Sequence, residues 1–204
     1  MELVVATRNK DKVREIKELL SDLKVRILTH EDFPNFPSVV EDGKSLKENA
    51  LKKARAIAKF TGKLALADDS GLEVEALGGA PGVFSSRFAG ENATYEDNNQ
   101  KLLSLLKGVP PEKRGAVFRC VIAIIDPEGR EVVVEGVCRG RITEKPKGKE
   151  GFGYDPVFEP EGSERTFAQM SLEEKNRISH RAKALKKAKE ALRKLKVLSG
   201  YGSS

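Results

Sequence analysis

Short apolar runs alternate with helix-patterned segments along this chain, and the way they are joined constrains the fold most. Apolar runs at residues 3–6, 25–28 and 64–67 are separated by segments whose apolar residues recur every three or four positions. Two longer strand-like runs, residues 116–126 and 131–141, are joined only by a tight turn. Strands joined by helices run parallel, whereas strands joined by a tight turn run antiparallel. The pattern therefore predicts an α/β fold in which a long mixed β-sheet is flanked by helices.

Polar capping residues predict where two of these helices begin. Ser45 followed by Glu48 opens a helix that ends at Gly62, and Thr94 followed by Asp97 opens a second helix. We predict one domain over residues 1–198 and a tail at 199–204, because no segment is long and polar enough to be a linker. The longest apolar run has six residues, far below the about 18 residues of a membrane-spanning helix. Charges within the first twelve positions argue against a secretory signal, so we expect a soluble, cytoplasmic protein.

Cysteine and histidine are scarce, which limits the metal chemistry. Cys120 and Cys138 lie on the two strands of the predicted hairpin but not directly opposite each other, so we expect no disulfide. The two histidines, His30 and His180, are too few for a zinc cluster. Hard metals bound by carboxylates remain possible.

The basic charge is concentrated near the C-terminus. Residues 175–196 carry ten Lys or Arg and one acid, Glu190. The net positive charge of this segment is therefore larger than the net charge of +6 of the whole chain. Apolar residues recur at helical spacing through this segment, so one helix face packs on a core and the lysines occupy the other. A solvated lysine face is the simpler interpretation, and a surface for polyphosphate or nucleic acid is the alternative.

Two adjacent acids follow the apolar run 64–67. Asp68 and Asp69 stand at what we predict to be the C-terminal end of a buried strand, where ligands of open α/β sheets bind. Adjacent carboxylates repel each other unless a cation lies nearby, and Glu41 is a third carboxylate that could reach it. The pattern is compatible with a Mg²⁺ site, and equally with a turn capped by Asp68 and a solvated Asp69.

Two other polar segments could bind a ligand. Thr7, Arg8, Asn9 and Lys12 follow the first strand at the start of a helix, where backbone amides and side-chain donors suit a phosphate chain, although ordinary helix caps look the same. Near the C-terminus, aromatic and polar residues in a glycine-flanked loop and at a helix junction could meet a base and a phosphate, although aromatic residues more often fill cores. These residues are Phe152, Gly153, Tyr154, Asp155, Lys175, Ser179, His180 and Arg181.

Taken together, these segments resemble the inosine triphosphate pyrophosphatase family, which hydrolyses non-standard purine nucleoside triphosphates such as ITP, dITP and XTP. The resemblance covers nearly the whole chain and rests on six stretches. They are Ala6-Thr-Arg-Asn-Lys-Asp-Lys-Val, Glu41-Asp-Gly-Lys-Ser-Leu-Lys-Glu-Asn-Ala, Ala67-Asp-Asp-Ser-Gly-Leu-Glu-Val, Gly79-Ala-Pro-Gly-Val-Phe-Ser-Ser-Arg-Phe-Ala-Gly, Gly151-Phe-Gly-Tyr-Asp-Pro-Val-Phe and Ser179-His-Arg-Ala.

The resemblance implies a fold with two lobes around a nucleotide-binding cleft, a homodimer, and Mg²⁺ as cofactor. It implies that Asp69 is the general base and that Glu41 and Asp69 hold the metal, and we expect Asp68 to be a third metal-binding residue. The residues implied in substrate binding are Thr7, Arg8, Asn9, Lys12, Lys53, Ser70, Phe152, Gly153, Tyr154, Asp155, Lys175, His180 and Arg181.

Two alternatives stay open at this point. One is a related pyrophosphatase that acts on modified pyrimidine or methylated nucleotides. The His180-Arg181 donor pair beside Phe152 favours a purine 6-oxo group instead, because an adenine 6-amino group would leave buried donors unpaired. The other is a nucleic-acid-binding module built on residues 175–196. That segment contains no aromatic residue on which a base could stack, so nucleic acid is an improbable partner.

Overall fold

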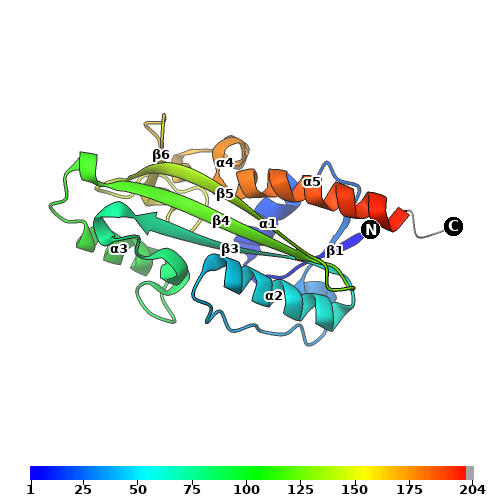
Figure 1. The fold of residues 1–204 in the computed structure, drawn as a ribbon. Helices are drawn as coiled ribbons and strands as arrows, with labels where there is room; N and C mark the ends of the chain where they lie inside the picture. The colour runs from blue at the N-terminus through cyan, green and yellow to red at the C-terminus, as the bar shows by residue number, and fades with distance from the viewer. Residues whose placement is uncertain (201–204) are drawn as a thin grey trace. The chain divides into compact units, whose positions relative to one another are not determined.

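The computed structural model describes the backbone of residues 1–200 and the side chains of residues 1–195. In this part of the chain six strands form one sheet in the order β2-β1-β3-β4-β5-β6 (Figure 1). β1 (Glu2–Val5) pairs in parallel with β2 (Arg26–Leu28) and with β3 (Leu64–Val74). β4 (Gly115–Ile125) is followed by β5 (Glu131–Ile142), which pairs antiparallel with β6 (Phe158–Pro160). The predicted mixed α/β sheet is confirmed.

The chain divides into two compact units. Unit 1 comprises Met1–Asp69, Cys120–Gly136 and the chain from Ala182 onward, and unit 2 comprises Ser70–Arg119 and Val137–Arg181. Strands β3, β4 and β5 and helix α5 (His180–Gly200) contribute residues to both units. Of the predicted tail, residues 199 and 200 belong to α5, and residues 201–204 lie outside the described part of the chain.

In unit 1, helices cover both faces of the strands. Alternate residues of a strand point to opposite faces, so Leu3 and Val5 of β1 share a face with Leu64 and Leu66 of β3. These four residues form one buried cluster with Ile16 and Leu20 at α1 (Lys10–Leu19) and with Leu185 and Leu192 of α5. Helix α2 (Leu46–Thr61) lies on the opposite side of these strands from α5 (Figure 1).

The predicted helix ends are confirmed by their caps. The Ser45 hydroxyl accepts a hydrogen bond from the Glu48 amide at 3.1 Å, and α2 ends at Gly62, whose φ of 63° is a left-handed conformation that favours glycine. In unit 2, Thr94 and Asp97 form a complete capping box at the start of α3 (Tyr95–Leu105).

The core of unit 2 combines α3 with strand residues and an aromatic cluster. Leu102 and Leu106 at α3 join Leu72 and Val74 of β3, together with Phe118, Phe158 and Phe167. The basic C-terminal segment is divided into α4 (Leu172–Ile178) and α5 by Ser179, whose backbone is extended. This break sets the positions of His180 and Arg181 at the start of α5.

The structure corrects the sequence prediction at two strands. β3 was expected to end at Ala67, but it continues to Val74, so Asp68 and Asp69 lie inside the strand and not at its end. The turn-like sequence Asp-Asp-Ser-Gly is extended because β3 has β4 as a neighbour along the sheet, which overrides local turn preference. β6 was not predicted, because three residues carry too little pattern to be recognised.

Two further expectations concern thiols and membranes. Cys120 and Cys138, both in the described part of the chain, are buried and are not joined in a disulfide, as predicted. No helix among the described residues is long and apolar enough to cross a bilayer.

Candidate active site

Asp68 and Asp69 follow the point where β1 stops alongside β3. The last paired residues are Val5 and Leu66, and the Ala6 amide still donates to the Leu66 carbonyl at 2.8 Å. Successive strand residues point to opposite faces, so the two carboxylates have different partners. Asp68 forms an ion pair with Lys12 of α1 at 3.3 Å, whereas Asp69 faces Lys53 of α2.

Lys53 connects the acids of unit 1. Its ammonium lies 2.5 Å from Glu41 and 3.4 Å from Asp69, and it donates to the Asp68 carbonyl oxygen at 2.6 Å. The side chain of Lys53 is only 9% exposed, and that of Asp69 is 11% exposed. A buried charge is stable only when it is paired and hydrogen-bonded, which this arrangement achieves.

The same arrangement sets the basicity of the carboxylates. Burial raises the pKa of Asp69 above its ordinary value, and Lys53 and Lys12 offset this effect only in part. Burial also opposes ionisation of Glu41, but Lys53 outweighs it and holds the pKa of Glu41 below its ordinary value. Burial would lower the pKa of Lys53, and the surrounding carboxylates reverse this and raise it. Burial therefore makes Asp69 more basic than an ordinary aspartate, Lys53 makes Glu41 less basic than an ordinary glutamate, and Lys53 itself stays charged.

The donor set suits a hard cation, although it is not a preformed cage. Across residues 1–195, no three His, Cys, Asp or Glu side chains lie close enough together to hold a metal ion. Glu41 and Asp69 nevertheless share one cation, the Lys53 ammonium. Mg²⁺ takes one or two carboxylates and completes its octahedron with water and phosphate oxygens, so these two residues fit it.

The predicted phosphate loop is largely occupied with its own backbone. The Asn9 side chain caps α1 by accepting from the amides of Asp11 and Lys12 at 3.0 and 3.1 Å, and the Thr7 hydroxyl accepts from the Asn9 amide at 3.1 Å. Arg8 turns to the loop after β2, where its guanidinium donates to the Phe36 carbonyl oxygen and lies over the Phe36 ring. Lys12 is thus the residue of this group that the structure brings to the acids.

In unit 2, Asp155 organises the loop that carries Phe152. Its Oδ2 accepts from the Phe152 amide at 3.0 Å and from Lys175 Nζ at 2.6 Å. The side chains of Asp155 and Lys175 are each 3% exposed, so this is a buried ion pair. A Cβ at Gly151 would come within 2.0 Å of Asp155 Oδ2, and Gly151 has a φ of 70°. Only glycine fits beside the carboxylate there.

Cations and aromatic rings gather around this loop. Arg181 is fully buried, its Nη2 lies 3.1 Å from the Ser70 hydroxyl, and its guanidinium carbon lies 5.5 Å from the Phe152 ring centre. Lys175 Nζ lies 4.8 Å from the same ring centre. His180 stacks on Phe118 at 4.4 Å with an interplanar angle of 7°. A second cluster is thus formed by Ser70, Phe152, Asp155, Lys175, His180 and Arg181, and that it binds substrate stays a prediction.

The sequence analysis grouped Gly153 and Tyr154 with the ligand-binding candidates, but their contacts in the structure differ. The Tyr154 ring belongs to the core, its hydroxyl donates to the Ser85 carbonyl oxygen at 2.6 Å, and burial raises its pKa. The Gly153 carbonyl oxygen accepts from Nδ2 of Asn99 on α3 at 3.0 Å. Sequence reasoning missed Asn99, and the only available signal was its place in a well-capped helix.

Known proteins resemble this chain over nearly its whole length. The profile of the Ham1 family matches residues 3–191, which is most of the chain. The chain belongs to the Ham1 family. A dITP/XTP pyrophosphatase of Desulforamulus reducens is 56% identical over 96% of this Ham1 chain and 97% of its own length. A dITP/XTP pyrophosphatase of Geobacter sulfurreducens is 54% identical over 93% of this chain and 96% of its own. The solved structure of a HAM1 protein from Coxiella burnetii has a TM-score of 0.86 and 44% identity over 95% of this chain and 99% of its own.

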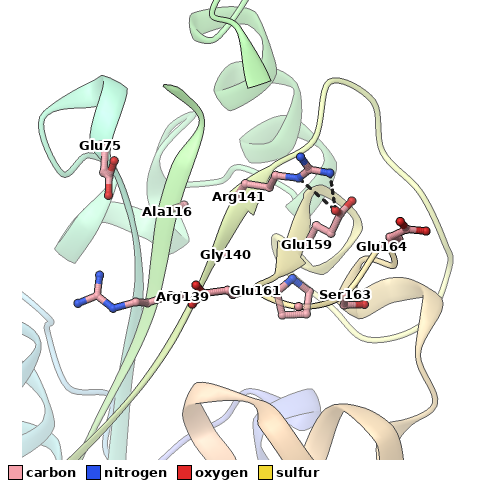
Figure 2. Close-up of a pocket in the computed structure, with 11 residues that line it drawn as sticks. Glu75, Ala116, Arg139, Gly140, Arg141, Glu159, Glu161, Ser163 and Glu164 are labelled. Atoms are coloured by element: carbon pink, nitrogen blue, oxygen red, sulfur yellow. Dashed lines mark hydrogen bonds and ion pairs between the residues drawn. The ribbon is translucent and has the colours of Figure 1, made fainter. Parts of the chain in front are cut away.

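Unit 2 of this Ham1 chain also contains a pocket of about 620 Å³. Figure 2 shows it beside β5 and β6, with the ion pair between Arg141 and Glu159 among its lining residues. Their Nη2 and Oε1 atoms are 2.7 Å apart. None of the residues predicted to bind substrate lines this pocket.

Proposed function

We propose that this Ham1 chain hydrolyses non-standard purine nucleoside triphosphates, namely ITP, dITP and XTP, to the monophosphate and pyrophosphate. The observation that carries the proposal is Asp69, a buried carboxylate with a raised pKa that faces a charged lysine. Relatives that share about half of its residues over nearly its whole length are named dITP/XTP pyrophosphatases, and the motifs resemble that family throughout.

The proposed chemistry is attack of water on the α-phosphorus. Asp69 accepts a proton from the water, and the water oxygen forms a new bond to the α-phosphorus. The bond between the α-phosphorus and the oxygen that bridges it to the β-phosphate breaks, and pyrophosphate leaves. A general base works best when its pKa is raised toward the working pH, which is the direction in which burial moves Asp69.

Positive charge for the leaving pyrophosphate comes from Lys12 and Lys53, which lie against the acids of β3. Glu41 and Asp69 would hold Mg²⁺, because their oxygens are hard ligands and already share one cation. When bound, the metal would neutralise charge on the phosphate oxygens and orient them. Thr7 and Asn9 contribute indirectly, by fixing the start of α1 from which Lys12 projects.

The cluster of unit 2 would bind the base. Phe152 offers a ring for stacking, and Arg181 and His180 are donors for a purine 6-oxo oxygen. A guanidinium can only donate, so it accepts no hydrogen bond from the 6-amino group of adenine. A base that leaves a buried donor unpaired is strongly rejected, so these donors would favour a 6-oxo purine over adenine.

Two further features follow from the family resemblance and are part of the proposal. We propose that the active form is a homodimer and that it works in the cytoplasm, where the nucleotide pool that it would clean is found. The absence of a membrane-spanning helix in the described residues is compatible with this setting.

The test is pyrophosphate release from a panel of ITP, dITP, XTP, ATP, GTP and CTP, each with Mg²⁺ and after chelation. We expect fast release from the first three substrates, slow release from ATP and CTP, and little activity without the metal. Release of inorganic phosphate in place of pyrophosphate, or equal rates across the panel, would contradict the proposal.

The matched variant is Asp69→Asn, which keeps the size of the side chain and removes its basicity. We expect it to fold normally and to lose several orders of magnitude in kcat, since both the base and a metal charge disappear. Turnover near that of the unchanged chain would remove Asp69 from the mechanism.

A further inference from the structure

Helix α3 contacts the Phe152 loop at two places on one of its faces. Asn99 Nδ2 donates to the Gly153 carbonyl oxygen at 3.0 Å. The Tyr95 ring centre lies 5.9 Å from the Phe152 ring centre, with an interplanar angle of 48°. Residues four positions apart are neighbours on a helix surface, so Tyr95 and Asn99 form one edge of α3. That edge contacts both the backbone of the loop and the ring it carries.

The hydrogen bonds of Asn99 indicate which contact its side chain contributes to the structure. Asn99 is 7% exposed, and its Oδ1 is buried with no hydrogen-bond partner in the described structure. A buried acceptor without a partner costs free energy that a leucine of similar size would not. Its neighbour Asn98 differs, because Oδ1 accepts from the Ala89 amide at 2.8 Å and Nδ2 donates to the Ser86 carbonyl oxygen at 3.2 Å. The bond to Gly153 is therefore what an asparagine supplies at position 99.

The loop needs such a restraint because of its glycines. Gly151 and Gly153 have φ values of 70° and 62°, and glycine has more accessible backbone conformations than any other residue. Asp155 restrains the first half of the loop through the Phe152 amide. Asn99 restrains the second half through Gly153. Phe152 lies between these two anchors.

We propose that Asn99 is a positioning residue for the nucleotide base: by holding the Gly153 carbonyl oxygen, it keeps the Phe152 ring in the orientation on which the base stacks. This inference rests on the proposed function, in which Phe152 stacks on a purine. Tyr95 packs against the same ring at a tilt. A loosened loop weakens binding in the ground state and in the transition state alike, so its loss raises KM and leaves kcat nearly unchanged.

The experiment compares the unchanged chain with Asn99→Leu and Asn99→Asp, and with Gln100→Leu as a control. Leucine removes both polar groups, and aspartate keeps the volume but removes the donor. Gln100 is the exposed next residue, and its side-chain amide bonds Glu96 and not the loop. Each variant is measured for kcat and KM with ITP, for thermal midpoint, and for hydrogen exchange of the Phe152 amide by NMR without substrate.

We expect both Asn99 variants to raise KM about tenfold, the effect of one lost hydrogen bond of ordinary strength. We expect kcat to change little and the Phe152 amide to exchange faster. The thermal midpoint of Asn99→Leu should change little, because removal of the unpaired Oδ1 offsets loss of the bond to the Gly153 carbonyl oxygen. Gln100→Leu should change none of these quantities.

An unchanged KM with unchanged Phe152 exchange would overturn the inference. A lower thermal midpoint with kcat and KM both altered would assign Asn99 a purely structural role, and would overturn it too. The exchange measurement needs no substrate. If the unchanged chain hydrolysed no nucleotide, the proposed function would fail, and Phe152 exchange would still decide whether Asn99 orders the loop.

Discussion

Asp69 and Glu41 share the Lys53 ammonium yet differ in how it affects them. Asp69 is the more deeply buried carboxyl, so desolvation prevails and its pKa is raised, whereas for Glu41 the charge of Lys53 prevails and its pKa is lowered. In the metal-free protein, Asp69 should therefore lose its proton at a higher pH than an ordinary aspartate does, and Glu41 at a lower pH than an ordinary glutamate does.

We predict that carbon-13 NMR titration of the metal-free protein will show Asp69 ionising above 3.8 and Glu41 below 4.5, their ordinary values. Lys53 lowers both pKa values, so Lys53→Met should move both midpoints upward. An Asp69 midpoint at or below 3.8 would contradict the account of how its basicity arises.

In the proposed function, specificity for the base depends on one buried guanidinium, that of Arg181. Arg181→Ala should lower the ratio of kcat/KM for ITP over ATP by a factor that corresponds to about 1 to 3 kcal/mol, because the donor that penalises a 6-amino group is gone. The ratio does not depend on how much of the variant folds. Phe152→Ala is the control. Stacking does not distinguish one purine from another, so kcat/KM should fall by similar factors for ITP and ATP. An unchanged ratio in Arg181→Ala would mean that other groups recognise the base.

Residue types suggested candidate side chains for the site, but they did not predict what each side chain contacts. The family resemblance implied Lys53 in substrate binding. It did not show that Lys53 joins Glu41 to Asp69, because that contact depends on α2 lying beside β3. Arg8 follows a strand like its neighbours, and yet its guanidinium bonds the Phe36 carbonyl oxygen, a partner 28 residues away. Contacts between distant segments leave no local pattern in one sequence.

Among the elements, the loop at residues 151–155 should respond differently to replacement of its two glycines. Gly151→Ala should raise KM for ITP strongly, because a Cβ there would come within 2.0 Å of Asp155 Oδ2 and displace the carboxylate from the Phe152 amide. Gly153→Ala is the matched comparison. Its φ is also positive, but a Cβ there meets nothing within 4 Å, so only backbone strain is added. Equal effects of the two substitutions on KM would show that the Asp155 contact is unimportant.

Elements with capping residues and long periodic patterns were predictable from sequence. Ser45 and Gly62 mark the ends of α2 because each satisfies backbone groups locally. The second half of β3 was not predictable, since Asp68 to Gly71 has the composition of a turn and becomes strand only beside β4. The same limit applies to β6, whose three residues are recognised as strand only through their pairing with β5.

At the scale of the whole molecule, the charge distribution favours an enzyme over a nucleic-acid-binding module. Part of the basic face of α5 is used within unit 1, where Lys189 and Arg193 pair with Asp22 and Lys187 donates to the Glu135 carbonyl oxygen. Lysines engaged in this way release fewer counterions on binding a polyanion. The acids of β3 and the Arg181 cluster instead fit the proposed reaction on a small charged substrate.

The most direct test of the central claim is to hydrolyse ITP in oxygen-18 water and to locate the label by mass spectrometry. Attack on the α-phosphorus, with Asp69 as base, predicts one labelled oxygen in the inosine monophosphate and none in the pyrophosphate. In the same water, Asp69→Asn should yield almost no product. Label in the pyrophosphate or in inorganic phosphate would place the attack at another phosphorus and would contradict the proposed reaction.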